Sequence, residues 1–283
     1  MEIKNINAIK NELDELLLKK LMVIEGCIVS MSSLIVAYSG GVDSSFLLKV
    51  SLDLLKDNVL AVMGISDTYP SSEIKNAKYN AELLGAKFLA IETCELSNEK
   101  FVSNPPDRCY YCKNELFTKL LELEKKKGIL YVSDGSNYED LNDYRPGIKA
   151  ASDIGIRSPL IESEFTKKEI IEISRILGLP TWDKPPQPCL SSRFPYGTRI
   201  TKERLNMVEQ AEEFLSQLGF KYFRVRYHNE VARIEVQRDD LLYLLIEENS
   251  KNIWEKFREI GFIYTAIDIL GYRSGSMNEM LSG

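Results

Sequence analysis

Short apolar runs and helix-like segments alternate through the first half of the chain. Four apolar runs have the length of buried strands: 33–38, 59–65, 87–93 and 129–134. Four further segments repeat apolar residues at helical spacing: 44–56, 71–84, 113–126 and 166–177. Strands that alternate with helices in this way are typical of a parallel sheet covered by helices on both faces. The pattern therefore predicts an α/β fold with a parallel, doubly wound sheet.

The order of the predicted elements changes after a stretch rich in proline. Proline density ends regular structure, so this stretch predicts an interdomain segment or an active-site loop. The elements predicted beyond it are a helix at 202–218, strands at 222–227 and 231–237, a helix at 239–260 and a strand at 262–270. Their αββαβ order predicts a small, mostly antiparallel α+β domain for substrate or oligomer contacts. We expect two domains, 1–185 and 186–283.

Composition narrows the class of protein. The chain has 283 residues, of which 44% are hydrophobic and 28% charged, as is typical of a soluble globular protein. Its net charge of −6 argues against general nucleic-acid binding, which needs a basic surface. No apolar stretch reaches the roughly 18 residues that span a bilayer, and the N-terminus lacks the pattern of a secretory signal. We expect a cytoplasmic protein without membrane or nucleic-acid partners.

Residues 39–44, Ser-Gly-Gly-Val-Asp-Ser, lie between a predicted strand and a predicted helix. Backbone N–H groups at the start of such a helix, together with its positive dipole end, bind phosphate oxygens. The run lacks the Gly-Lys-Ser/Thr ending of a Walker loop. It resembles the pyrophosphate-binding loop of the ATP-pyrophosphatase (adenine nucleotide alpha hydrolase-like) superfamily, whose members split ATP into AMP and pyrophosphate. This resemblance implies that fold, with ATP and Mg²⁺ as cofactors.

The resemblance also implies roles for single residues of a nucleotide site. The candidates from the loop itself are Ser39, Gly40, Gly41, Asp43 and Ser44. Asp43 is implied as a ligand of Mg²⁺, and Ser39 and Ser44 as phosphate contacts, while the two glycines let the backbone approach the phosphates closely. Ser66 and Gly135 follow predicted strands and are further candidates for the nucleotide site. Each is equally compatible with an ordinary turn.

The five cysteines fall into two groups. Cys27 and Cys94 stand alone and are predicted to be small buried side chains. Cys109 and Cys112 form a Cys-x-x-Cys pair, and Cys189 lies far from them in the sequence. Three thiolates can hold a cubane iron–sulfur cluster that leaves one iron open. Zinc more often takes a fourth ligand, and the single histidine lies far along the chain.

Several segments taken together resemble the LarE family. Besides the loop at 39–44, they are 107–113 (Asp-Arg-Cys-Tyr-Tyr-Cys-Lys), 189–193 (Cys-Leu-Ser-Ser-Arg) and 271–276 (Gly-Tyr-Arg-Ser-Gly-Ser). Members of this family are ATP-dependent pyridinium-3,5-biscarboxylic acid mononucleotide sulfurtransferases, which help to build the nickel-pincer cofactor of lactate racemase. The resemblance implies that this chain adenylates a substrate carboxylate and replaces AMP with sulfur, leaving a thiocarboxylate.

The family has two versions, which differ in the origin of the sulfur. In one version, the cysteine that matches Cys189 gives up its own sulfur and becomes dehydroalanine. In the other, two further cysteines join it as ligands of a [4Fe-4S] cluster, which carries an extra sulfide on its open iron. Cys109 and Cys112 make this chain similar to the cluster version, which also implies a sulfide source as a partner. A sacrificial Cys189 is the alternative.

Basic residues are the candidates for binding the anionic groups of the substrate. Lys113 and Arg108 would supply positive charge beside the adenylate, and Arg193 would serve the same end. Arg224 and Arg226 are the candidates for the phosphate and the second carboxylate, because guanidinium groups bind such anions in a bidentate fashion. Strand alternation places these two arginines on one face. The resemblance further implies a homo-oligomer, since the family is known to form hexamers.

Three other functions fit parts of the sequence. A tRNA thiolation enzyme can combine this ATP loop with three cysteines and a cluster, but it would need a basic RNA-binding surface. An amidotransferase-type synthetase would share the loop, yet it gives no reason for the Cys-x-x-Cys pair and Cys189. A nucleotide sensor stapled by zinc would hold tetrahedral zinc and release no pyrophosphate.

Overall fold

The computed structural model describes residues 3–142, 146–273 and 276–281. The chain forms two compact units. The first unit comprises Met1–Ser66, Ser71–Glu95 and Asp107–Gln187, and the second comprises Asp67–Pro70, Leu96–Pro106 and Pro188–Gly283. Two short segments from the first half of the sequence thus belong to the second unit. The predicted domains, 1–185 and 186–283, had placed both segments in the first.

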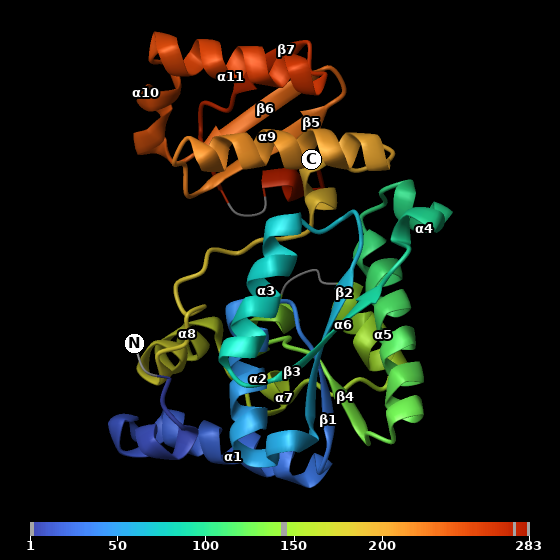
Figure 1. Cartoon of the computed structure of the whole chain (residues 1–283), viewed down its shortest axis with the longest axis vertical. Helices are drawn as coiled ribbons and strands as arrows, with labels where there is room; N and C mark the ends of the chain where they lie inside the picture. The colour runs from blue at the N-terminus through green and yellow to red at the C-terminus, as the bar shows by residue number, and fades with distance from the viewer. Residues whose placement is uncertain (1–2, 143–145, 274–275, 282–283) are drawn as a thin grey trace. The chain divides into compact units, whose positions relative to one another are not determined.

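A four-stranded parallel sheet forms the centre of the first unit (Figure 1). Its strands are β1 (Leu34–Ala37), β2 (Val59–Ile65), β3 (Lys87–Glu92) and β4 (Tyr131–Ser133). They lie in the order β3-β2-β1-β4, and each neighbouring pair is parallel. The parallel α/β sheet predicted from the alternation of apolar runs and helical segments is confirmed.

Helices cover both faces of this sheet. The chain moves one way across the sheet from β1 to β3 and then returns past β1 to β4. Right-handed crossovers therefore put α2 (Val42–Leu55) and α3 (Ser71–Leu83) on one face and α5 (Arg108–Lys127) on the other, as Figure 1 shows. The remaining helices of this unit are α1 (Glu15–Met31), α6 (Pro146–Ile154), α7 (Pro159–Glu162) and α8 (Lys167–Leu177), with 3₁₀ turns at Ile6–Glu12, Lys56–Asn58 and Tyr138–Asn142.

Apolar side chains hold the helices to the sheet. Beneath α5 and α6 the buried cluster consists of Ile35, Val62, Leu116, Phe117, Leu120, Val132, Ala150, Ala151 and Ile156. On the other face, residues 44–51 of α2 are all buried, because α1 and α8 pack on the side of α2 that the sheet leaves open. Burying one large apolar side chain contributes about 1.5–3 kcal/mol, so α2 and the loop before it are fixed firmly.

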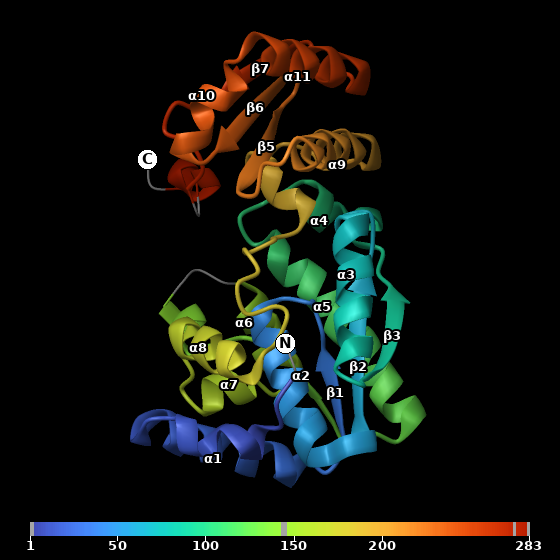
Figure 2. The ribbon, with the colours of Figure 1, turned by 60° about the vertical axis from the view of Figure 1, so that its left-hand side comes forward.

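The second unit contains a three-stranded sheet in the order β5-β6-β7 (Figure 2). Its strands are β5 (Phe223–His228), β6 (Val231–Val236) and β7 (Tyr264–Ile267). Its helices are α4 (Glu99–Val102), α9 (Lys202–Gln217), α10 (Leu241–Leu244) and α11 (Glu247–Ile260), with 3₁₀ turns at Leu190–Arg193, Arg238–Asp240 and Ser276–Leu281. A further 3₁₀ turn, Glu95–Ser97, joins the two units.

The pairing of this small sheet differs in part from the prediction. β5 and β6 are antiparallel, but β6 and β7 are parallel. The expectation of a mostly antiparallel sheet is therefore wrong for β7. The reason is α11, since a helix between two neighbouring strands brings the chain back to the same end of the sheet and makes the strands parallel.

Strand register divides the small sheet into an apolar face and a charged face. Phe223, Val225 and Tyr227 of β5 stand opposite Val236, Ile234 and Ala232 of β6, and all six are buried. On the other face, Arg224 stands opposite Glu235 and Arg226 opposite Arg233. Because alternate residues of a strand point to opposite faces, this register gathers charged side chains on one side of the sheet.

Some element limits also differ from the prediction. Helix α5 begins at Arg108 rather than 113, directly after the capping residue Asp107, so the Cys-x-x-Cys pair lies within the helix. The helix predicted at 239–260 is interrupted before α11, where Ile246 adopts an extended ψ of 129°. The strand predicted at 262–270 is confined to β7, and α6 was not predicted. Among the helices that the structure describes, none is long and apolar enough to cross a membrane.

Candidate functional site

The edge of the large sheet where β1 and β4 end is the place expected for a ligand. Successive connections leave these two neighbouring strands in opposite directions, and open α/β sheets bind ligands at the carboxyl ends of such strands. The loops that follow β1 and β4 touch at this edge. A Cβ on Gly135 would lie 3.0 Å from the backbone nitrogen of Ser44, so the absence of a side chain at 135 allows this close approach.

The loop after β1 has the geometry of an anion-binding turn. Gly40 has φ of +72°, and a Cβ there would lie 2.7 Å from the Cβ of Ala77 in α3, so this position requires glycine. Gly41 caps α2, and the hydroxyl oxygens of Ser39 and Ser44 lie 3.1 Å apart. The first N–H groups of a helix have no partner within the helix. The loop therefore directs backbone donors and two hydroxyls toward the place where a phosphate would lie.

One carboxylate oxygen of Asp43 accepts a hydrogen bond, and the other has no hydrogen-bond partner among the described residues. Its Oδ2 accepts a hydrogen bond of 2.6 Å from Nζ of Lys167 at the start of α8. Its Oδ1 is buried and has no hydrogen-bond partner within the described residues. A buried carboxylate oxygen without a partner is unfavourable unless a cation satisfies it, and Mg²⁺ takes oxygen ligands. The residue thus fits the role of a Mg²⁺ ligand.

Two lysines near the loop were not predicted from the sequence. Lys167 pairs with Asp43 across 124 residues, and Lys184 donates to the carbonyl oxygen of Gly40 at 3.0 Å across 144 residues. Lys184 also pairs with Glu73 of α3 at 2.7 Å. The sequence around Lys167 shows only a helix start, since Thr166 and Glu169 form a capping box. Positive charge missing from the loop itself is thus supplied by distant segments.

The Cys-x-x-Cys pair lies in the first two turns of α5. Cys109 is exposed and Cys112 is half-buried, and residues three apart share one side of a helix. The Cys112 sulfur lies 3.4 Å from Oε1 of Glu95, whose side chain is buried. Arg108 is also buried, and the Lys113 ammonium lies 5.5 Å from the centre of the Phe117 ring. Arg108 and Lys113 therefore begin α5 with positive charge beside the pair.

Cys189 is held by its neighbours in the second unit. It caps the 3₁₀ turn Leu190–Arg193, and the Leu190 N–H donates to the carbonyl oxygen of Thr68 at 2.8 Å. Arg193 donates to the carbonyl oxygens of Pro188 and Cys189 and pairs with Glu212 through Nε and Nη2. With each guanidinium nitrogen engaged inside the unit, Arg193 acts by positioning the Cys189 segment.

Arg193 and Glu212 form a buried ion pair beside the Cys189 segment, and the pKa values of both groups are shifted. Burial tends to raise the pKa of Glu212, but the charge and hydrogen bonds of Arg193, together with the Arg224 charge and the Val225 N–H, hold that pKa below its usual range. The pKa of Arg193 is raised: burial lowers it, and the Glu212 charge and hydrogen bonds more than offset this. Both side chains are therefore charged in the folded protein at neutral pH.

We expect Arg193→Met to lower the free energy of unfolding by about 3–5 kcal/mol at pH 7, because it leaves a buried carboxylate without its cation. A carboxyl whose pKa is depressed on folding stabilises the protein above its unfolded pKa, about 4.3, and loses this contribution as pH falls through the folded value. The wild type should therefore lose stability below about pH 4.3 more steeply than Arg193→Met. Urea unfolding across pH 3–7 measures both effects. The same dependence of unfolding free energy on pH in the wild type and in Arg193→Met would contradict a stabilising ion pair between Arg193 and Glu212.

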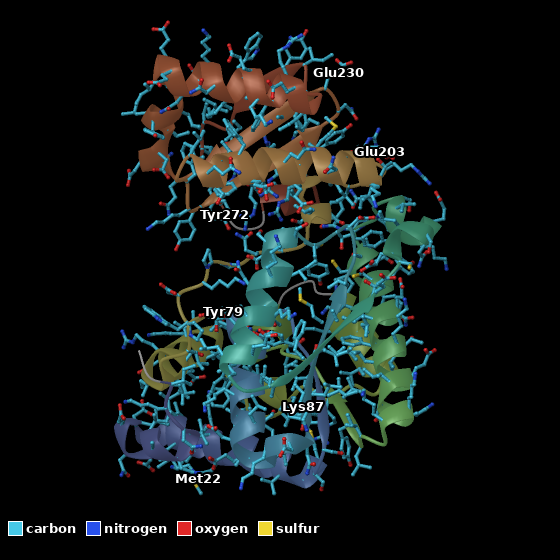
Figure 3. The ribbon with its side chains drawn as sticks, viewed as in Figure 1. Met22, Tyr79, Lys87, Glu203, Glu230 and Tyr272 are labelled. Carbon is cyan, nitrogen blue, oxygen red and sulfur yellow. The ribbon has the colours of Figure 1, made fainter. Side chains whose placement is uncertain are left out.

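The charged face of the small sheet holds the other predicted arginines. Arg226 donates to Glu235 at 2.7 Å and to the Ser276 hydroxyl at 2.9 Å, while its Nε is buried without a partner among the described residues. The Arg224 guanidinium lies 5.2 Å from the ring centre of Tyr272, which is labelled in Figure 3. Burial, followed by the nearby Arg193 charge, lowers the pKa of Arg224. A cluster of buried guanidinium groups is a favourable place for an anion.

The segment 271–276, the last of those that resemble the family, contacts the charged face of the small sheet through Ser276. Gly271 has φ of +71°, and a Cβ there would lie 2.6 Å from the carbonyl oxygen of Val236, so only glycine fits. Arg273 donates to Asp268 at 3.2 Å, and the Ser276 hydroxyl donates to Glu235 at 2.9 Å. Residues 274 and 275 of this segment lie outside the described residues.

The remaining candidates have varied surroundings. Ser66 directly follows β2, at the same edge of the sheet as the phosphate loop. Cys94 is exposed, so its prediction as a buried side chain is wrong. Cys27 is half-buried, and burial together with Glu162 raises the pKa of its thiol to about 11. His228 ends β5, and burial, followed by Arg233, lowers its pKa.

The described parts of the chain contain no group of three or more His, Cys, Asp or Glu side chains placed to hold a metal. Cys109 and Cys112 belong to the first unit, and Cys189 to the second. Thiolates are nevertheless the ligands that iron–sulfur clusters take.

The parallel sheet, the glycine loop at its switch point and the unsatisfied carboxylate of Asp43 define an α/β protein with an ATP-pyrophosphatase fold. No family model matches the chain. A protein of Synechocystis sp. described only as uncharacterized is 43% identical over 248 residues, which cover 88% of this chain and 92% of that protein. The pyridinium-3,5-bisthiocarboxylic acid mononucleotide synthase of Lactiplantibacillus plantarum is 40% identical over 248 residues, 87% of this chain and 89% of that enzyme.

A third relative, an uncharacterized protein of Methanocaldococcus jannaschii, is 34% identical over 245 residues, 85% of this chain and 91% of that protein. The chain therefore belongs to the LarE family, that of the synthase from L. plantarum. The resemblance drawn from the four sequence segments is confirmed.

Proposed function

We propose that this enzyme is an ATP-dependent sulfurtransferase. It adenylates a carboxylate of pyridinium-3,5-biscarboxylic acid mononucleotide and converts it to a thiocarboxylate for nickel-pincer cofactor synthesis. The observation that carries the proposal is the loop after β1, which contains the capped start of α2, two neighbouring hydroxyls and the unsatisfied oxygen of Asp43. The family supports the substrate, because the L. plantarum relative is named for the bisthiocarboxylic acid mononucleotide.

The first half-reaction needs positive charge around the phosphates of ATP. The N–H groups at the start of α2 bind the phosphate oxygens, and Lys167 and Lys184 supply the charge that the loop lacks. Asp43 would hold Mg²⁺, which when bound neutralises charge on the transferring phosphate. With pyrophosphate stabilised in this way, the substrate carboxylate can attack the α-phosphorus to form the acyl-adenylate, from which AMP later leaves.

The substrate carries a phosphate and a second carboxylate. Arg224 and Arg226 are the proposed contacts for these groups, because both are buried and share one face of the small sheet. Arg108 and Lys113 are proposed to bear on the adenylate. Arg193 instead keeps the Cys189 segment in place, since its guanidinium is already bound to Glu212.

The sulfur would come from one of two sources. Cys109, Cys112 and Cys189 are the proposed ligands of a [4Fe-4S] cluster, which when bound would supply a deprotonated sulfide to displace AMP. In the alternative, Cys189 itself donates its sulfur and becomes dehydroalanine. The external sulfide source and the homo-oligomer implied by the family both stay predictions.

The reaction can be tested with protein purified without oxygen. ATP, Mg²⁺, a sulfide source and the biscarboxylic acid mononucleotide should give AMP, pyrophosphate and a product in which sulfur has replaced a carboxylate oxygen, seen by mass spectrometry. A reaction with unmodified tRNA in place of the mononucleotide is the control for the RNA thiolation alternative. Pyrophosphate release with tRNA alone, or with neither substrate, would contradict the proposal.

A further inference from the structure

The two cysteines of the Cys-x-x-Cys pair have a spacing in the helix that is compatible with a disulfide. Cys109 and Cys112 are the second and fifth residues of α5. Helix geometry places Cα atoms three residues apart at about 5 Å, within the range of disulfides.

The surroundings give the two thiols different roles. Cys109 is exposed, so a dissolved reagent reaches it first, whereas Cys112 is half-buried. The Cys112 sulfur is anchored 3.4 Å from Oε1 of Glu95, a side chain only 2% exposed. Glu95 is fixed in turn by Thr93, whose hydroxyl lies 3.1 Å from the same oxygen. The Cys109 thiol is thus exposed to solvent. The Cys112 thiol lies on the same side of the helix and contacts Glu95.

We propose that Cys109 and Cys112 form a reversible disulfide, with Cys109 as the entering thiol and Cys112 as the resolving one. The oxidant is a small-molecule disulfide such as oxidised glutathione. The Cys109 sulfur attacks it, forms a mixed disulfide and releases one glutathione thiol. Cys112 then attacks the Cys109 sulfur and releases the second. In total, two protein thiols are oxidised to one disulfide, one glutathione disulfide is reduced to two thiols, and both protons pass to the released thiols.

One consequence rests on the proposed function. The disulfide occupies two of the three sulfurs proposed as cluster ligands, so the oxidised enzyme cannot bind the cluster until it is reduced. Oxidation would then hold the cluster-free enzyme in a protected and reversible form. Irreversible oxidation of an exposed thiol to sulfinic or sulfonic acid would be avoided.

The test uses the full-length protein without iron, equilibrated in mixtures of reduced and oxidised glutathione. After acid quenching and alkylation, peptide mass spectrometry should find a bond between Cys109 and Cys112 that disappears in excess reduced glutathione. Cys112→Ser should accumulate glutathione on Cys109. Cys109→Ser should acquire glutathione on Cys112 about tenfold more slowly, because that sulfur is less exposed. Cys94→Ser is the matched control, since Cys94 is exposed nearby in the sequence, and it should leave the disulfide unchanged.

Persistence of a Cys109–glutathione adduct in the wild type, or a disulfide that contains Cys94, would overturn the proposal. Iron binding by the reduced protein is measured separately. Reduced protein that binds iron but never forms the disulfide would refute this inference and leave the proposed function intact. Reduced protein that forms the disulfide reversibly but binds no iron would refute the cluster alone.

Discussion

Asp43→Asn is expected to lower the rate of pyrophosphate release about 100- to 1,000-fold, because it removes the charge proposed to hold Mg²⁺ against the phosphates. The unsatisfied Oδ1 of Asp43 is the reason for the size of this effect. Asparagine keeps the shape of the side chain but binds Mg²⁺ weakly. The apparent Mg²⁺ requirement should therefore rise together with the loss of rate, which a titration of Mg²⁺ at fixed ATP measures.

Lys167→Met is the matched control for this prediction. Lys167 contacts the other oxygen of Asp43 at 2.6 Å, so its loss breaks the ion pair but leaves Oδ1 available. We expect this variant to lose activity without a change in the Mg²⁺ requirement. If both variants and the double variant had the same defect, Asp43 would act only through Lys167. Asp43→Asn with near wild-type activity at low Mg²⁺ would contradict the role as a metal ligand.

The phosphate loop was predictable because its chemistry is contiguous. Residues 39–44 carry the capping residue, both hydroxyls and Asp43, and the strand and helix that flank them have clear apolar patterns. Gly40 could be assigned to a turn, but the reason for glycine there depends on Ala77, which is brought against the loop by α3. Local sequence patterns thus predict the loop, and packing against Ala77 explains why position 40 requires glycine.

The partners that complete the site could not be predicted in the same way. Lys167 and Lys184 meet the loop across more than a hundred residues, and nothing in their own segments distinguishes them from surface lysines. Arg193 shows the opposite difficulty. The sequence predicts that it supplies positive charge beside the adenylate, yet a carboxylate of α9, Glu212, binds it inside the unit. Which carboxylate pairs with which arginine is decided by tertiary packing.

The division of the chain has a direct bearing on the sulfur chemistry. The nucleotide loop, Cys109 and Cys112 lie in one unit, and Cys189 and the arginines of the small sheet lie in the other. In the proposed function, the loop that activates the substrate carboxylate lies in the first unit, and Cys189, proposed for sulfur delivery, lies in the second. Substitutions at Cys189 should accordingly affect sulfur transfer without disturbing the loop that binds ATP.

Cys189→Ala is expected to abolish thiocarboxylate formation while ATP is still split to AMP and pyrophosphate. Alanine removes the sulfur but keeps the backbone carbonyl of residue 189 that Arg193 binds, so the segment should keep its conformation. Parallel measurement of pyrophosphate and of the thiocarboxylate mass separates the two half-reactions. A variant that still makes thiocarboxylate would show that the sulfur reaches the substrate by another route.

Cys109→Ala and Cys112→Ala then distinguish the two sources of sulfur. If the three cysteines bind a cluster, each single variant should lose both iron and the thiocarboxylate, because removing one thiolate leaves a site that cannot complete cluster binding. If Cys189 is sacrificial, Cys109→Ala and Cys112→Ala should still form product once per chain. The iron-free wild type should in that case lose the mass of H₂S at Cys189 after turnover. Iron content, product yield and intact mass are therefore measured for the wild type, Cys109→Ala, Cys112→Ala and Cys189→Ala, and they decide between the two mechanisms.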